Sequence, residues 1–448
     1  MSQEALEIIS LEKWFNQQWF DYQNNMFITP ENYSSVYNPF KNFGQIPEIS
    51  DKVAFPIEQG GLAEVLKSDS ARPKSYLRTG SDIEDLLVKA LVDMEAEYVT
   101  DQSGLSACVF PSGMAAISST LSFIIAGIDP KKRGNHKFIV DKNLYLHTEG
   151  LFSLYLPEQT GIGSSIFVDF QNENELKKVF KENKNKIAGI FYEPVSNPWL
   201  TYIDTRKVKD IAETILGENK VPIIVDNTFL TPYLQQQYKL GATIVIHSGT
   251  KYFSGKGDHL AGYVIAPARF INGFTKDFNS QKTKFVGMRE YMVGTGVVVS
   301  SQSDYKNLLI KLLGFPERMK RHVTNCTKFN ESLEKRRNDM VDEIFYTNLG
   351  NKTRDGSSGA VISFTLKGNK KEQYERAKAI TNFVSDSKNP NLLSQSSLGE
   401  RATLLFNLYG FDQYNLMRLA VGHHENVDDA INVLNKGFDY ALNLKKIS

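Results

Sequence analysis

A lysine flanked by hydroxyl groups follows a short apolar run, and it is the clearest sign of chemistry in this sequence of 448 residues. The run covers residues 243–246, and Ser248, Thr250 and Lys251 come directly after it. A lysine at the end of a buried strand is costly unless its charge is removed or used. A covalent link between its amine and a carbonyl group removes the charge, and the two hydroxyls can bind an anion beside it. Taken alone, the position also suits a solvated loop lysine.

A carboxylate stands at the end of a second apolar run, where Asp226 follows residues 222–225 and precedes Lys251 by 25 positions. Such a carboxylate can keep a pyridine nitrogen protonated, which makes the ring accept electrons from an attached carbon. Together, Lys251 and Asp226 indicate the cofactor pyridoxal 5'-phosphate (PLP), held by the lysine as a Schiff base. On its own, Asp226 could equally cap the next helix.

A third segment, Ser112-Gly113-Met114, begins a predicted helix and offers an anion site. The backbone N–H groups at a helix start and the serine hydroxyl can bind a phosphate. The same residues also suit an ordinary helix start. We expect these three residues, with Ser248 and Thr250, to bind the phosphate of PLP.

The elements that would position these residues alternate between helices and short apolar runs. Helices are predicted over 84–97 and 114–127, and strands over 138–140, 187–192, 222–225, 243–246 and 263–265. Continuously apolar strands that alternate with helices predict an α/β fold with a mostly parallel sheet. In such sheets ligands bind beyond the carboxyl ends of the strands, where Asp226 and Lys251 stand.

The pattern changes at both ends of the chain, which predicts three parts. They are residues 1–70, an N-terminal arm and helix; 71–295, a large PLP-binding domain; and 296–448, a small α+β domain. The small domain is expected to contain helices over 304–337, 372–385 and 427–444 and strands over 360–366 and 418–421. The apolar arm could cover either its own subunit or a neighbouring one.

The overall composition excludes several classes of partner. The net charge is +1, so no global field attracts nucleic acid or an anionic membrane. No apolar stretch reaches the roughly 18 residues of a membrane span, and two cysteines suit a reducing compartment. We expect a cytoplasmic protein with no nucleic-acid or membrane partner, and the seven histidines suggest no metal site.

The three segments, in this order, resemble the Cys/Met-metabolism family of PLP-dependent enzymes, the relatives of cystathionine γ-synthase, cystathionine γ-lyase and methionine γ-lyase. The family's Ser-Gly-Met, Asp-Asn-Thr and Ser-x-Thr-Lys motifs match residues 112–114, 226–228 and 248–251, and the resemblance extends over about 73–440. It implies the PLP-dependent transferase fold type I, with a mostly parallel sheet in the large domain and a smaller C-terminal α+β domain.

The resemblance also implies roles for residues outside these motifs. Tyr76 and Arg78 would reach the phosphate of the adjacent subunit, and Tyr145 would stack on the cofactor ring. The remaining matches are Asn197 for the phenolic oxygen and the substrate, Arg418 for the substrate α-carboxylate, and Ser397 behind that carboxylate. Because sites would be shared between subunits, a homodimer is the expected minimal unit, and the family's usual dimer of dimers implies a homotetramer.

The rim of the expected pocket departs from the family pattern. Leu146 and His147 replace two glycines after Tyr145, and Glu400 replaces the second glycine of the family's Ser-Leu-Gly-Gly. The segment before Arg418 is also short. The chain therefore resembles a divergent member, and His147 is the only histidine that we expect near the pocket.

The expected activity is PLP-dependent elimination or replacement at Cγ of a small L-amino acid, as in transsulfuration. The candidate substrates are a homoserine ester, homocysteine, methionine or a cystathionine-like compound, so the enzyme would be a carbon–sulfur lyase or transferase. Lys251 would be the general base, Tyr145 a proton donor or acceptor, and Asp226 the partner of the ring nitrogen. The alternatives are β-elimination from cysteine or cystathionine, or a non-catalytic PLP-binding relative.

Overall fold

The computed structural model describes most of the chain after residue 79. The described residues are 80–96, 104–218, 220–273, 287–299, 302–346, 349–354, 356–357, 359–409 and 414–443. They belong to two compact units, one made of 88–299 and 317–448, and the other including 80–87 and 302–316. The predicted arm and helix of residues 1–70 lie outside the described residues, as do Tyr76 and Arg78.

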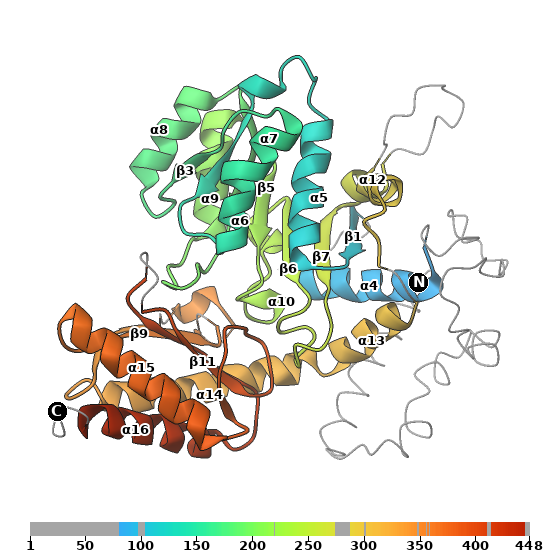
Figure 1. The fold of residues 1–448 in the computed structure, drawn as a ribbon. Coiled ribbons are helices and arrows are strands. Elements are labelled where there is room, and N and C mark those ends of the chain that lie inside the picture. Colours follow the sequence, from blue (N-terminus) through green and yellow to red (C-terminus); the bar gives the residue numbers. More distant parts are fainter. Residues whose placement is uncertain are drawn as a thin grey trace, which may run out of the picture. The chain divides into compact units, whose positions relative to one another are not determined.

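The first unit contains a seven-stranded sheet with the order β1-β7-β6-β5-β4-β2-β3 (Figure 1). Its strands are β1 (Leu105–Phe110), β2 (Lys137–Asp141), β3 (Ile166–Val168), β4 (Ile187–Tyr192), β5 (Ile223–Asp226), β6 (Ile244–Ser248) and β7 (Gly262–Pro267). The pairs from β6 to β3 are all parallel, and β7 runs antiparallel to both of its neighbours. The predicted mostly parallel sheet is confirmed.

Helices cover both faces of this sheet because the strands are apolar on both sides. Ile224 and Ile246 pack in one core with α5 (Gly113–Ala126), whereas Val225 lies in a second core with residues of α8 (Glu173–Asn183) and α9 (Thr205–Leu216). Consecutive side chains of β5 therefore point to opposite faces. The other helices here are α4 (Asp82–Ala96), α6 (Leu146–Gly150), the π-helix η4 (Leu151–Tyr155), α7 (Leu156–Thr160), α10 (Thr231–Leu234), α11 (Ala268–Asn272), α12 (Met288–Thr295), and the 3-10 turns η3 (Arg133–Asn135) and η5 (Tyr238–Leu240).

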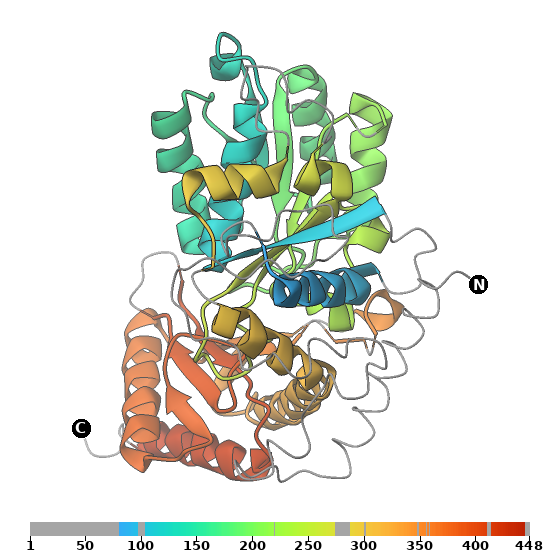
Figure 2. The ribbon, with the colours of Figure 1, turned by 90° about the vertical axis from the view of Figure 1, so that its right-hand side faces the viewer.

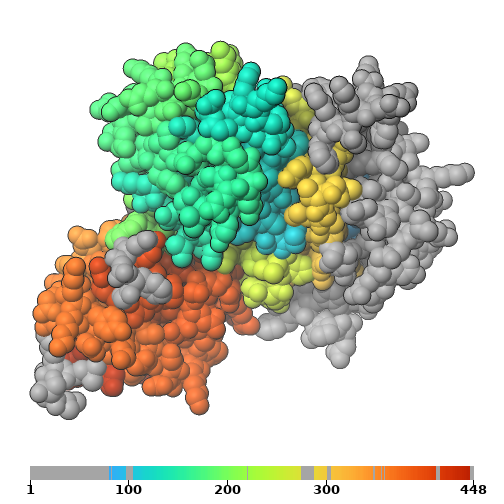
Figure 3. Space-filling view, turned by 45° about the horizontal axis from the view of Figure 1, so that its top comes forward, coloured from blue at the N-terminus to red at the C-terminus, as the bar shows by residue number. Residues whose placement is uncertain are grey.

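A five-stranded sheet, β10-β11-β12-β9-β8, forms the C-terminal part of the same unit. Its strands are β8 (Val341–Phe345), β9 (Val361–Leu366), β10 (Leu392–Ser394), β11 (Thr403–Asn407) and β12 (Met417–Ala420). Figure 2 shows the orange α15 (Lys370–Ser387) and the red α16 (Val427–Asn443) beside these strands, and a 3-10 turn, η6 (Gly350–Lys352), follows β8. Phe364 and Phe438 share its core with residues of α14 (Phe315–Lys335). In space-filling view this part appears in orange and red (Figure 3).

One predicted helix of the small domain is wrong in extent. The helix expected over 304–337 is two helices, α13 (Gln302–Leu313) and α14, which are separated at Gly314. Pro316 stands in the first turn of α14, where its missing N–H costs no hydrogen bond. Within the described residues, no helix has the length and apolarity needed to cross a bilayer.

Candidate active site

Lys251 lies in a turn just beyond β6, and its backbone N–H donates to the Ser248 carbonyl at 3.2 Å. Its Nζ donates to Oγ of Ser397 at 3.2 Å, which brings together two predicted site residues far apart in sequence. Burial lowers the pKa of Lys251, and the positive charge of Arg418 lowers it further, whereas Glu400 raises it. A lowered pKa favours the neutral amine, which is the form that attacks a carbonyl carbon.

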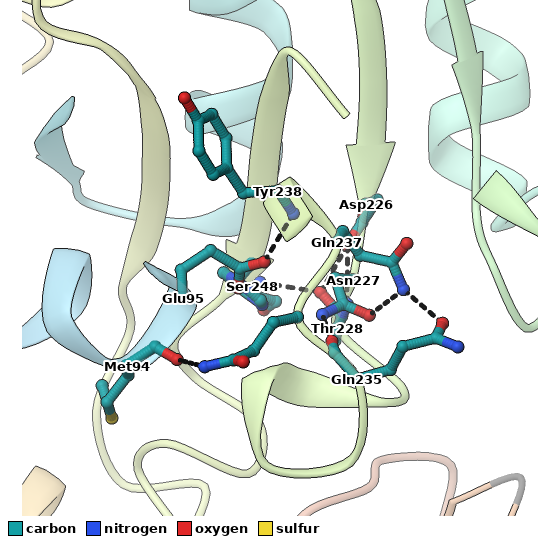
Figure 4. Close-up of polar contacts among 11 residues, drawn as sticks. Met94, Glu95, Asp226, Asn227, Thr228, Gln235, Gln237, Tyr238 and Ser248 are labelled. Atoms are coloured by element: carbon teal, nitrogen blue, oxygen red, sulfur yellow. Dashed lines mark hydrogen bonds and ion pairs between the residues drawn. The ribbon is translucent and has the colours of Figure 1, made fainter. Parts of the chain in front are cut away.

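Asp226 lies at the carboxyl end of β5, and the Thr228 hydroxyl connects it by hydrogen bonds to the end of β6 (Figure 4). Its Oδ1 accepts hydrogen bonds from Thr228, at 3.1 Å from the backbone N and 2.6 Å from Oγ1. The Thr228 hydroxyl in turn accepts from the backbone N of Ser248 at 2.8 Å. Burial raises the pKa of Asp226, while the Thr228 hydrogen bonds and the nearby His247 side chain lower it. Thr228 was not among our candidate residues, although the Asp-Asn-Thr motif contains it.

The start of α5 lies against the ends of β6 and β7 because two glycines permit the approach. A Cβ atom on Gly113 would lie 2.9 Å from Cβ of Ser248, and one on Gly262 would lie 2.1 Å from the Ser112 carbonyl oxygen. Ser112 is the N-cap, and its Oγ accepts from the backbone N of Ala115 at 3.1 Å. The N–H groups of the first turn, including that of Met114, precede any intrahelical acceptor. This helix start beside Ser248 therefore suits an anion.

Thr250 uses its hydroxyl on the neighbouring backbone. Its Oγ1 accepts from the Ala261 N at 3.1 Å and donates to the Ala261 carbonyl oxygen at 3.4 Å. The hydrogen bond from Thr250 to the phosphate stays a prediction.

Arg418, on β12, is a buried cation that is 4% exposed. Its Nη1 donates to Oδ1 of Asn197 at 3.0 Å, and its Nη2 donates to the carbonyl oxygens of Ser396 at 2.5 Å and Ser397 at 3.2 Å. Among the described residues, Nε has no hydrogen-bond partner and no carboxylate forms an ion pair with this guanidinium. Burial lowers its pKa to about 10. A buried guanidinium that contacts only neutral acceptors is suited to bind a carboxylate from a ligand.

Tyr145 lies at the N-cap of α6 and is 42% exposed, close to Arg418 and Glu193. Its backbone N donates to Oε1 of Glu193 at 2.7 Å. Burial raises the pKa of Tyr145, the neighbouring Glu193 carboxyl group raises it further, and the Arg418 charge lowers it. The His147 ring contacts the Tyr145 ring edge to face, with 5.2 Å between centroids. The two aromatic rings therefore lie side by side at the start of α6.

Besides His147, a second histidine, His247, lies near a candidate site residue. His247 directly precedes Ser248 and lies close enough to Asp226 to lower the pKa of that carboxyl group. The His247 Nε2 lies 3.3 Å from Oε2 of Glu95, and both side chains are fully buried. Glu95 also accepts from the backbone N of Tyr238 at 3.1 Å (Figure 4). In the sequence, the only sign of this placement is that His247 stands directly before the lysine motif.

These residues fit the chemistry of PLP. A helix N-terminus with two serines suits its phosphate, the Asp226 carboxylate suits a pyridinium, and the lowered pKa of Lys251 suits a covalent link. In the part of the chain that the structure describes, no group of three or more His, Cys, Asp or Glu side chains is arranged to hold a metal ion.

Comparisons with known proteins give a family and several relatives. Residues 58–439 match the family described as "Cys/Met metabolism PLP-dependent enzyme". An L-methionine gamma-lyase of Fusobacterium nucleatum subsp. polymorphum is 32% identical over 407 residues, which cover 85% of this chain and 89% of that protein. A cystathionine beta-lyase of Lactococcus lactis subsp. cremoris is 30% identical, covering 70% of this chain and 74% of its own length.

Solved structures share the fold of this chain. The cystathionine gamma synthase of Xanthomonas oryzae pv. oryzae superposes with a TM-score of 0.66 at 23% identity, covering 85% of this chain and 92% of the other. This similarity and the family match identify fold type I and PLP as the cofactor. The chain therefore belongs to the Cys/Met metabolism family of PLP-dependent enzymes.

Proposed function

We propose that this enzyme catalyses elimination or replacement at Cγ of a small L-amino acid. The single observation that carries the proposal is Arg418, a buried guanidinium without a carboxylate partner among the described residues, on the same site as Lys251. An amino acid brings the missing α-carboxylate. The 32% identical relatives that are named L-methionine gamma-lyase favour a leaving group on Cγ.

The residues that would hold PLP come from five segments. When bound, PLP withdraws electrons from the substrate Cα and makes loss of the Cα proton easier. Asp226 would contact the ring nitrogen, Asn197 the phenolic oxygen, Tyr145 the ring face and Lys251 the reactive carbonyl carbon. The proposed phosphate ligands are Ser112, Gly113, Met114, Ser248 and Thr250.

Four side chains would bind the substrate and move its protons. Arg418 would hold the α-carboxylate through two parallel hydrogen bonds, with Ser397 behind it, and so fix the direction of the Cα–H bond. Nζ of Lys251 would take the Cα proton and give it up to C4′ of the cofactor. The neutral amine would then take a Cβ proton, so that the leaving group departs from Cγ with its bonding electrons. The Tyr145 hydroxyl would exchange a proton with the substrate amine or the leaving group.

A second candidate reaction is β-elimination, in which the same residues act and the leaving group is on Cβ. The Lactococcus lactis relatives named cystathionine beta-lyase, 30% identical over 321 residues, favour it. The altered wall residues Leu146 and His147 are consistent with either reaction. We also propose a homodimer, or a homotetramer built from it, in which Tyr76 and Arg78 reach the phosphate of the adjacent subunit.

Cystathionine separates the two reactions because one substrate gives different 2-oxo acids. Cleavage at Cγ yields 2-oxobutanoate, cysteine and ammonia, whereas cleavage at Cβ yields pyruvate, homocysteine and ammonia. Mass spectrometry of the products from cystathionine, methionine, homocysteine, cysteine and O-acyl-homoserines, with Lys251→Ala as the blank, should show 2-oxobutanoate or a thioether. Pyruvate alone from cystathionine would replace this proposal with β-elimination.

A further inference from the structure

A second buried carboxyl group lies beside Asp226, and the proposed reaction does not use it. Glu193 follows β4 directly and is 4% exposed. β4 is the neighbour of β5, whose last residue is Asp226, and the negative charge of Asp226 acts on Glu193. Two carboxyl groups this close and this buried do not both ionise at low cost.

The surroundings of the two acids decide which one carries the charge. Asp226 accepts two hydrogen bonds from Thr228 and lies near His247, and both neighbours lower its pKa. Within the residues that the structure describes, Glu193 accepts one hydrogen bond. Burial raises the pKa of Glu193 well above its usual range, and the charge of Asp226 raises it further. Asp226 therefore carries a negative charge at lower cost than Glu193, and Glu193 is the member of the pair that binds a proton more readily.

The hydrogen bond that Glu193 accepts fixes the start of the segment carrying Tyr145. Its Oε1 accepts from the Tyr145 backbone N at 2.7 Å. Tyr145 is the N-cap of α6 and makes no side-chain capping bond, so this contact holds the helix start in place. The carbonyl oxygen of a neutral carboxylic acid accepts such a bond.

We propose that Glu193 is a positioning residue that acts as a neutral carboxylic acid: it holds Tyr145 through the backbone and adds no second negative charge beside Asp226. This inference rests on the proposed role of Tyr145 on the face of the PLP ring. It predicts that an amide can replace the carboxyl group, because an amide is neutral and offers the same acceptor oxygen.

A double-mutant cycle on PLP affinity tests the proposal. The full-length chain, depleted of PLP, is titrated with PLP as wild type, Glu193→Gln, Glu193→Ala, Tyr145→Ala and Glu193→Ala/Tyr145→Ala. Glu193→Gln should stay within about twofold of wild type. Glu193→Ala should weaken PLP binding about tenfold, because the Tyr145 N–H loses its acceptor. In the Tyr145→Ala background the same change should have an effect below about twofold.

Three results would overturn the inference. They are a Glu193→Gln loss as large as that of Glu193→Ala, equal Glu193→Ala losses in both backgrounds, and a pH profile of PLP affinity between pH 6 and 8 that Glu193→Gln displaces. The pH comparison needs only the amide variant, so it decides the question even if Glu193→Ala does not fold. Glu375→Gln, at an exposed position on α15, is the matched control.

The readout separates this inference from the proposed function. A wrong substrate class leaves the affinity cycle unchanged, because no substrate is present. A Tyr145→Ala variant with unchanged PLP affinity would contradict the proposed role of Tyr145, and the inference would fall with it. If Tyr145→Ala weakens PLP binding and the effect of Glu193→Ala on PLP affinity simply adds to it, the inference is overturned while the proposed function stands.

Discussion

Three buried or partly buried ionisable groups give the candidate site an electrostatic cost. Lys251 has a lowered pKa, Asp226 has a raised one, and Arg418 contacts only neutral oxygens among the described residues. Each group suits one part of the expected complex: Lys251 a carbonyl carbon, Asp226 a pyridinium, and Arg418 a carboxylate. The electrostatic cost that folding leaves at these residues is recovered when PLP and an amino acid bind.

Arg418→Ala should lower kcat/KM strongly while PLP content stays at the wild-type level. Loss of one partner of a buried charge pair costs about 2 to 5 kcal/mol, which is roughly 30-fold to several thousand-fold in kcat/KM. Steady-state kinetics and the PLP absorbance of the purified variant measure the two effects. Arg206→Ala, at an exposed position on α9, is the control. An unchanged kcat/KM in Arg418→Ala would mean that another residue holds the carboxylate.

At the scale of elements, the site depends on how closely α5, β6 and β7 approach. The approach is possible because Gly113 and Gly262 lack a Cβ atom where Ser248 and Ser112 lie. The Thr228 hydroxyl adds a hydrogen bond between the ends of β5 and β6. The phosphate site therefore comes from backbone packing as much as from side-chain chemistry.

Gly113→Ala should weaken PLP binding by roughly fivefold to 150-fold. The new Cβ would lie 2.9 Å from Cβ of Ser248, and overpacking of this kind costs about 1 to 3 kcal/mol. The measurement is a PLP titration of the depleted protein. Gly150→Ala is the matched control, because a Cβ there meets nothing within 4 Å and its φ is −58°. Equal PLP affinity in Gly113→Ala and wild type would refute this packing argument.

A histidine links the lysine loop to the C-terminal part of the unit and should make stability depend on pH. The His423 Nε2 donates to the Gly255 carbonyl oxygen at 2.9 Å. Burial, together with nearby arginines that include Arg318, lowers the pKa of His423 to about 4. The unfolded chain, with a histidine pKa of about 6.5, therefore binds this proton more readily, so stability falls as the pH drops from about 6.5 towards 4.

His423→Gln should reduce that pH dependence, because glutamine can donate a similar hydrogen bond but does not titrate. Thermal unfolding should show a smaller loss of Tm between pH 7 and pH 5 in His423→Gln than in wild type. His322 and His424 also have lowered pKa values and remain in both proteins, so the difference reports His423 together with its effect on the neighbouring ring of His322. An identical Tm loss in the two proteins would contradict the assignment.

Much of the architecture could be predicted from apolar periodicity, and the missed elements have physical reasons. All five predicted strands of the large sheet correspond to observed strands, but β1, with Ser106 and Ala107, lacks the β-branched pattern of a buried strand. At the site, the motifs pointed to Lys251, Asp226 and Ser112. The contacts of Glu193 with Tyr145 and of Thr228 with Ser248 join separate loops, and loop conformation is not encoded in residue spacing.

At the scale of the whole molecule, the site takes residues from both sheets of one compact unit. Lys251 follows the large sheet, whereas Arg418 lies on the small one and Ser397 near it. The site therefore exists only when both parts have folded. The proposed contribution of Tyr76 and Arg78 extends this dependence to a second subunit.

Mixing Arg78→Ala and Lys251→Ala chains tests the shared site. A hybrid dimer has one site with both groups intact, so random mixing of equal amounts should restore about a quarter of wild-type activity. Each variant alone should be weakly active or inactive. Subunit exchange is verified by native mass spectrometry with one chain isotopically labelled. No activity after verified exchange would show that Arg78 serves its own subunit or none.

The covalent position of the cofactor tests the central claim most directly. The PLP-loaded protein is reduced with borohydride, digested and mapped by mass spectrometry, with Lys251→Ala and Lys256→Ala treated in parallel. Lys256 is a matched control because it is exposed and only five positions further along the same loop. We predict a pyridoxyl group on Lys251 in wild type and Lys256→Ala, and none in Lys251→Ala. Stoichiometric labelling of any other lysine in the wild-type protein would contradict the account.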